Sequence, residues 1–184
     1  MPCFTLCEEG WFTRSYVIEN ECGKELFFIE SNASFWKDDF IVRRMYERGE
    51  FGSRIAVMEG NTESFGPYSY DITVEGELVA SVTDIVACCG PPAFVLQVFG
   101  GKHHRRTFYL DKASLFGREF EVIRHDRHVA TYYRHWLSPH EIDVDDDIAR
   151  TDAELTQLLI FSCVIMERIT TRKRRSQHAL QANP

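Results

Sequence analysis

The sequence predicts a single, mainly β domain: a closed antiparallel β-barrel of about twelve strands around a central, C-terminal hydrophobic helix. Three observations carry this prediction. The chain has 184 residues, 44% of them hydrophobic, which is enough for one substantial core and too little for two average domains. Its first two-thirds consists of short alternating segments, and one helix near its end is apolar on every side. We expect the domain to span residues 1–170 and to be followed by a disordered, basic, polar tail over 171–184.

The strands are predicted by alternation of apolar and polar residues between turn signals. A first hairpin runs from 12–18 to 26–29, with Gly23 in the turn where a positive φ is needed. A second flanks Glu75-Gly76-Glu77, where apolar residues recur at every other position on both arms. Further strand candidates, separated by turn signals at 100–101 and 125–127, are 94–99, 106–110, 120–123, 129–133 and 142–144.

The helix is predicted over 151–169. Thr151 and Glu154 have the spacing of a capping box, in which each side chain satisfies a free backbone N–H. From Leu155 to Met166 large apolar side chains lie all around the axis, so the helix is buried on all sides. A membrane span is the alternative, but it needs about 20 apolar residues. This run is shorter and ends at Glu167-Arg168, and the sequence therefore predicts no transmembrane helix.

A sheet surrounds a helix only by curling into a barrel, and a barrel of about twelve strands is wide enough for one helix. Because the helix then fills the interior, we expect ligands to bind at the outer wall, the rims or the loops.

Four segments carry a family resemblance. They are 68–80 (YSYDITVEGELVA), 116–122 (FGREFEV), 128–136 (HVATYYRHW) and 142–147 (IDVDDD), the last running into the apolar helix. With these segments the sequence resembles the LURP-one-related family of the tubby C-terminal-like superfamily over most of 4–169. The resemblance implies a twelve-stranded barrel threaded by a C-terminal helix and a non-enzymatic role. Tubby-like domains hold phosphoinositide headgroups, but their basic motif has no residue-by-residue match in this chain.

Phospholipid scramblases resemble the chain more distantly, through a basic-Trp segment and an acidic loop ahead of an apolar helix. The chain lacks their Pro-rich N-terminal region and their dense cysteine cluster, having only the adjacent pair Cys88-Cys89.

Composition indicates an intracellular protein with reduced thiols. The sequence does not start with a basic region followed by a long apolar run, as a secretory signal would. The six cysteines show no regular spacing. The net charge is -7, yet residues 1–167 carry -12 because five of the 21 basic residues follow Glu167. An acidic body argues against a nucleic-acid partner, which needs basic residues spread over a face.

Two basic segments are the candidate binding sites for phosphate or anionic lipid. The first is Lys102, Arg105 and Arg106, beside Gly100-Gly101, where backbone and side chains can meet a phosphate. The second is the tail, with Arg172, Lys173, Arg174 and Arg175, which has the character of an anionic-membrane anchor or a nuclear address. A solvated hairpin loop and a solubilising tail are the respective alternatives.

An acidic segment is a candidate calcium site. Asp143, Asp145, Asp147 and Glu154 fall at positions 1, 3, 5 and 12 of a calcium-loop spacing, with Thr151 at position 9. Position 6 is Ile148 where such a loop has Gly, and a strand precedes it instead of a helix. The alternative is a strand-to-helix connection whose carboxylates favour the helix N-terminus.

No catalytic motif occurs: the chain has no GxSxG elbow, no P-loop and no HExxH, and we expect no enzyme. The histidines between 103 and 140 have no accompanying Cys or carboxylate ligands at the spacing of a structural zinc site, and we expect them to be solvated turn residues. The sequence therefore predicts a cytoplasmic protein, with peripheral-membrane or nuclear location as options, that binds anionic phospholipid headgroups such as phosphoinositides or acts as an adaptor. The alternatives are a scramblase-like, calcium-responsive membrane protein and a nuclear or scaffold factor.

Overall fold

The computed structural model describes residues 2–9, 15–33, 38–46, 50–61, 67–85, 93–112, 118–135 and 139–181. For Ala33, Lys112 and residues 174–181 the description covers the backbone alone.

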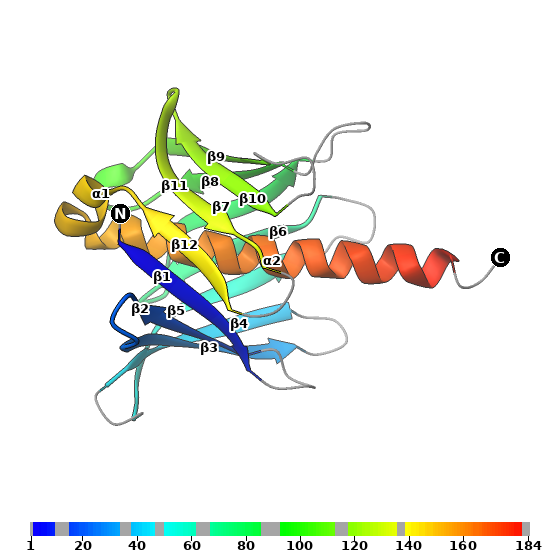
Figure 1. Cartoon of the computed structure of the whole chain (residues 1–184), viewed down its shortest axis with the longest axis horizontal. Coiled ribbons are helices and arrows are strands. Elements are labelled where there is room, and N and C mark those ends of the chain that lie inside the picture. Colours follow the sequence, from blue (N-terminus) through cyan, green and yellow to red (C-terminus); the bar gives the residue numbers. More distant parts are fainter. Residues whose placement is uncertain are drawn as a thin grey trace.

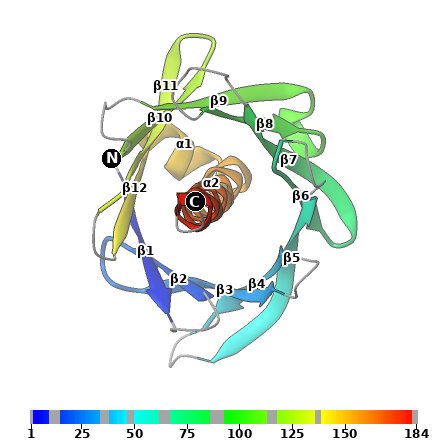
Figure 2. The ribbon, with the colours of Figure 1, turned by 90° about the vertical axis from the view of Figure 1, so that its right-hand side faces the viewer.

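Twelve antiparallel strands form one closed barrel in which each strand pairs with its neighbours in sequence and β1 closes the ring against β12 (Figures 1 and 2). The strands are β1 (Cys3–Glu9), β2 (Ser15–Asn20), β3 (Glu25–Ala33), β4 (Asp38–Met45), β5 (Phe51–Asn61), β6 (Ser69–Val74), β7 (Glu77–Ile85), β8 (Ala93–Val98), β9 (Arg106–Lys112), β10 (Glu119–Arg124), β11 (Arg127–Tyr133) and β12 (His140–Val144). The predicted fold class is confirmed.

The hairpins form where the turn residues require them. Gly23, in the turn between β2 and β3, has a φ of 72°. Glu75 and Gly76, between β6 and β7, have φ values of 54° and 86°, the two positive values of a type I′ turn, whose twist matches that of the flanking strands. Strands β1, β4 and β5 are the ones that the sequence analysis did not single out.

A long helix, α2 (Ala153–Gln181), runs along the barrel axis, with α1 (Asp146–Thr151) and the N-terminus at one end (Figures 1 and 2). We call this the α1 end and the other, where α2 leaves the barrel, the exit end. Among the described residues, neither helix has the sustained apolar length needed to cross a membrane.

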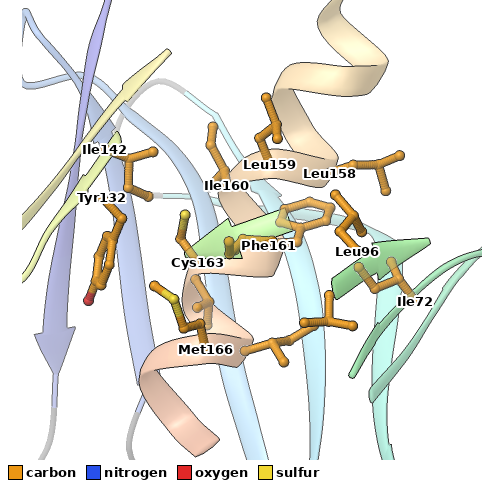
Figure 3. Close-up of a cluster of buried hydrophobic side chains, with 14 of the residues drawn as sticks. Ile72, Leu96, Tyr132, Ile142, Leu158, Leu159, Ile160, Phe161, Cys163 and Met166 are labelled. Atoms are coloured by element: carbon orange, nitrogen blue, oxygen red, sulfur yellow. The ribbon is translucent and has the colours of Figure 1, made fainter. Parts of the chain in front are cut away.

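The core is a single cluster in which α2 meets the inward faces of the strands (Figure 3). Apolar positions alternate along the strands, as in β4, β6 and β8, so one face of each strand contacts the helix. Phe161 of α2 packs edge-on against Phe27 of β3, with ring centroids 5.6 Å apart. Cys163, Val164 and Ile165 are fully buried, which is the all-round burial that the sequence predicts.

The start of the helix differs from the prediction. Asp152, and not Thr151, caps α2: its Oδ1 accepts a hydrogen bond from the Leu155 N–H at 3.0 Å. Thr151 belongs to the separate short helix α1 and donates its hydroxyl to the carbonyl of Asp147 at 2.5 Å. Asp and Thr are both good capping residues. Spacing alone therefore did not show which of these two adjacent residues caps α2.

The helix also continues past Ile169 to Gln181, so residue 170, where the sequence analysis placed the domain boundary, lies inside α2. The described cysteines, Cys3, Cys7, Cys22 and Cys163, are free thiols. Cys88 and Cys89 lie outside the described residues.

Candidate functional site

A cleft of about 380 Å³ opens at the α1 end, between the barrel wall and the junction of α1 with α2. Its apolar lining consists of Phe108, Val129, Ile148 and Leu155. Its polar lining consists of five basic or histidine side chains and one acid: His103, Arg106, Arg124, His125, Arg127 and Asp152. Three arginines therefore converge on one small concavity.

Two of these arginines come from the β10–β11 hairpin. A two-residue turn joins the strands, with φ values of 47° at His125 and 61° at Asp126. This turn places Arg124 and Arg127 directly opposite each other in the strand register. Like charges in directly opposite positions destabilise a strand pair. Arg127 is partly compensated by Asp145, whose Oδ1 lies 3.5 Å from its Nη2.

The third arginine, Arg106, begins β9 just after the 3-10 helix η1 (Gly101–His103). The residue before it, Arg105, has a φ of 63°, an uncommon conformation for a residue with a side chain, and its N–H bonds to the carbonyl of Val98 at 2.8 Å. Arg106 Nη1 lies 2.5 Å from Nδ1 of the buried His103. Because a guanidinium only donates, Nδ1 is the acceptor and the proton of a neutral His103 sits on Nε2.

Arg124 has an aromatic neighbour. Its guanidinium carbon lies 5.9 Å from the centroid of the Phe108 ring, and no described carboxylate forms an ion pair with it. Burial, together with the neighbouring charges of Arg106 and Arg127, lowers the pKa of Arg124. The cleft thus has a positive field that an anion would neutralise.

Asp152 is the one acid among the described lining residues, and its carboxylate already has partners. Lys102 Nζ lies 3.1 Å from its Oδ1, and Nε2 of His103 contacts its Oδ2. Burial raises the pKa of Asp152, but the Leu155 N–H, Lys102 and His103 outweigh it and hold the pKa below its ordinary value. The carboxylate therefore stays ionised at neutral pH.

The structure brings only part of the first predicted basic site together. Arg106 lines the cleft and Lys102 contacts the Asp152 carboxylate, whereas Arg105 is exposed and is not among the lining residues. Sequence reasoning missed Arg124 and Arg127, two of the three lining arginines. The available signal was a two-residue turn flanked by arginines, since such a turn makes its flanking residues neighbours.

The predicted tail site has a different environment. Arg172 and Lys173 lie at the exit end, where Arg172 Nη1 is 3.1 Å from Asp38 Oδ2 and Lys173 forms an ion pair with Asp84. Both carboxylates are buried, each 1% exposed. These two cations join α2 to the barrel wall. The side chains of Arg174 and Arg175 lie outside the described part of the chain.

The four residues of the predicted calcium site do not converge. Asp145 caps α1, with its Oδ1 3.1 Å from the Asp147 N–H, and it also lies 3.5 Å from Arg127. Asp143 is on β12, and Glu154 packs against Gly101, where an added Cβ would overlap its carboxylate. Within the described ranges, no three His, Cys, Asp or Glu side chains are placed to hold a metal ion.

Searches with protein-family models and against curated proteins find no match to this chain. The closed antiparallel barrel with its C-terminal helix is consistent with a tubby-like fold.

Proposed function

We propose that this chain is a non-enzymatic, tubby-like domain of the LURP-one-related type that binds an anionic, phosphate-bearing headgroup in the cleft at the α1 end. The observation that carries the proposal is the convergence of Arg106, Arg124 and Arg127 on one concavity. Among the described lining residues the single acid is Asp152, which already contacts Lys102 and His103. Arginine is suited to phosphate because its planar guanidinium donates two parallel hydrogen bonds.

The charge balance supports a phosphate monoester. Among the described lining residues and their ion-pair partners, Lys102 and the three arginines carry four positive charges, and Asp145 and Asp152 carry two negative charges. This set therefore has two positive charges in excess. A phosphate monoester carries between about -1.5 and -2 at neutral pH. A monophosphorylated phosphoinositide headgroup has such a group, and a phosphodiester lipid such as phosphatidylcholine does not.

The size of the cleft supports a small ligand. Ligand pockets begin at roughly 300 Å³, and this cleft is near that lower bound. A phosphorylated sugar or inositol ring is the kind of group that fits, with the phosphate among the arginines and the ring against the apolar lining. The proposed binding surface is therefore the α1 end of the barrel and not the basic segment after Ile169.

Liposome co-sedimentation tests the proposal. Vesicles of phosphatidylcholine with and without a few per cent phosphatidylinositol 4-phosphate distinguish the monoester from a bare membrane. A calorimetric titration with soluble inositol 4-phosphate distinguishes the headgroup from the lipid surface. We expect binding in both assays, weakened about tenfold by each of Arg106→Gln, Arg124→Gln and Arg127→Gln, which is about 1.4 kcal/mol per lost contact.

Arg44→Gln is the matched control, because Arg44 is exposed on β4 and does not line the cleft. The proposal fails if neither assay detects binding, or if the three cleft substitutions change affinity no more than Arg44→Gln does.

A further inference from the structure

Asp152 makes two kinds of contact: one caps α2, and the other joins its carboxylate to side chains at the edge of the cleft. Its Oδ1 accepts the N–H of Leu155 and so begins α2. Both of its carboxylate oxygens also contact side chains at the edge of the cleft: Oδ1 forms an ion pair with Lys102, and Oδ2 accepts the Nε2 proton of His103. Helix capping requires a short side chain with an acceptor oxygen and does not require the negative charge.

We propose that the Asp152 carboxylate is a built-in counter-anion of the cleft, which competes with the ligand for Lys102 and so sets the affinity of the site. This inference rests on the proposed function, since it concerns regulation of the same cleft. Asp152 is held between α1 and α2 by its bond to the Leu155 N–H, whereas Lys102 reaches it from η1 with a side chain that is 54% exposed. Lys102 is therefore free to turn toward a second anion.

The side chains of Asp152, His103 and Arg106 form a continuous chain of contacts. Asp152 fixes the Nε2 proton of His103, and Nδ1 of His103 then accepts from Arg106. An arriving phosphate faces one negative charge inside the lining and finds Lys102 and Arg106 already bonded. Neutralising that charge removes the repulsion and releases Lys102 from its ion pair.

Replacing the Asp152 carboxylate with a neutral side chain removes a like-charge repulsion between the lining and a bound phosphate. We expect Asp152→Asn to bind inositol 4-phosphate about tenfold more tightly than the unaltered chain. Asn keeps the acceptor that caps α2, so the helix start is retained.

Asp152→Ser is the second variant, because serine is neutral, shorter and also a good cap. If Asn at this position disturbs folding, as judged by circular dichroism and thermal unfolding, the serine variant still tests the loss of charge. Asp147→Asn is the matched control: it makes the same change in net charge on exposed α1, five residues away, and does not line the cleft.

A double-mutant cycle distinguishes a specific interaction between Asp152 and Lys102 from a general change in the charge of the cleft. While Asp152 holds Lys102, Lys102→Met should change affinity by less than about threefold. In the Asp152→Asn chain, where Lys102 is released to the ligand, the same substitution should weaken binding about tenfold.

The measurement is calorimetric titration of each chain with inositol 4-phosphate at one fixed ionic strength. Tighter binding by Asp152→Asn and Asp152→Ser, but not by Asp147→Asn, supports the inference, as does binding that appears only in the neutralised variants. If the unaltered chain binds and the neutralised variants bind no more tightly than Asp147→Asn, the inference is overturned and the proposed function stands. If no chain binds, both are overturned.

Discussion

Arg168 of α2 and Asp38 of β4 form a two-pronged ion pair: Nε lies 2.8 Å from Oδ2 and Nη2 lies 2.7 Å from Oδ1. The carboxylate is 1% exposed and also accepts the hydroxyl of Tyr70 at 2.5 Å. Arg172 adds a fourth contact. A buried carboxylate is tolerated only with this degree of compensation.

Removing the charge of Asp38 should therefore destabilise the protein. We expect Asp38→Asn to lower the free energy of unfolding by about 3 kcal/mol, because it leaves Arg168 partly buried without its counter-charge. Equilibrium urea denaturation measures this. The neighbouring Asp39→Asn is the control, since the described contact of the Asp39 carboxylate is a 3.3 Å bond from the Gly60 N–H. Similar losses from both substitutions would contradict a special role for Asp38.

The ion pair between Arg168 and Asp38 should make the free energy of unfolding depend on pH in the acidic range. Burial raises the pKa of Asp38, but the hydrogen bonds from Arg168 and Tyr70 outweigh it and hold the pKa below its ordinary value. A lowered folded-state pKa means that the stabilisation is complete above the unfolded pKa of about 3.9 and is lost as the pH falls through the folded value. Unfolding curves from pH 6 to pH 2 should show Asp38→Asn approaching the unaltered chain only below about pH 4. A constant difference over the whole range would be the contrary result.

Truncation should separate the anchoring part of α2 from the rest. A chain ending at Thr170 loses Thr171, which bonds to Glu167 at 2.9 Å, and the ion pairs of Arg172 and Lys173. We expect it to lose at least about 3 kcal/mol of stability, because Asp84 is then buried without its cation. A chain ending at Lys173 keeps these contacts and is the control. Equal thermal stability of the two chains would place the domain boundary at residue 170 after all.

The cleft should show a conflict between stability and binding. Arg124→Gln removes the repulsion between directly opposite Arg124 and Arg127, so we expect the free energy of unfolding to rise by about 0.5 kcal/mol at low salt. The gain should shrink at 1 M salt, where charges are screened. Arg44→Gln, whose strand partner is Phe27, should show no such gain. Loss of stability in Arg124→Gln would indicate that the arginine has a structural role.

Cys163 offers a probe of helix docking. It is completely buried on α2, and burial raises its pKa to about 12. Since only the thiolate reacts, iodoacetamide at pH 8 should leave Cys163 unmodified in the folded protein and alkylate it after urea unfolding. Peptide mass spectrometry identifies the site, with the exposed Cys22 as the internal control. Rapid labelling of Cys163 in native buffer would show that α2 leaves the barrel readily.

Local pattern was sufficient to predict the barrel. Alternation fixes which face of a strand is buried, Gly23 and Gly76 mark turns that need positive φ, and a helix apolar on all sides requires a surrounding sheet. The boundaries of that helix were harder to predict from the sequence. Thr151 and Asp152 are both competent caps, and the residues after Ile169 are polar, as in a solvated tail.

The candidate site was only partly predictable, because its residues are distant in sequence. Lys102 and Arg106 stand out as a basic stretch, but the cleft also needs Arg124, Arg127 and Asp152, and only the closed barrel brings these together.

The sequence by itself thus determined the barrel, its central helix and one basic loop, because periodicity and turn chemistry act over a few residues. The tertiary structure alone decided which charges meet. Arg172 and Lys173 point to buried Asp38 and Asp84. The arginines of β9 and the β10–β11 hairpin gather at the start of α2, because ion pairs and clefts depend on distances in space that no local pattern records.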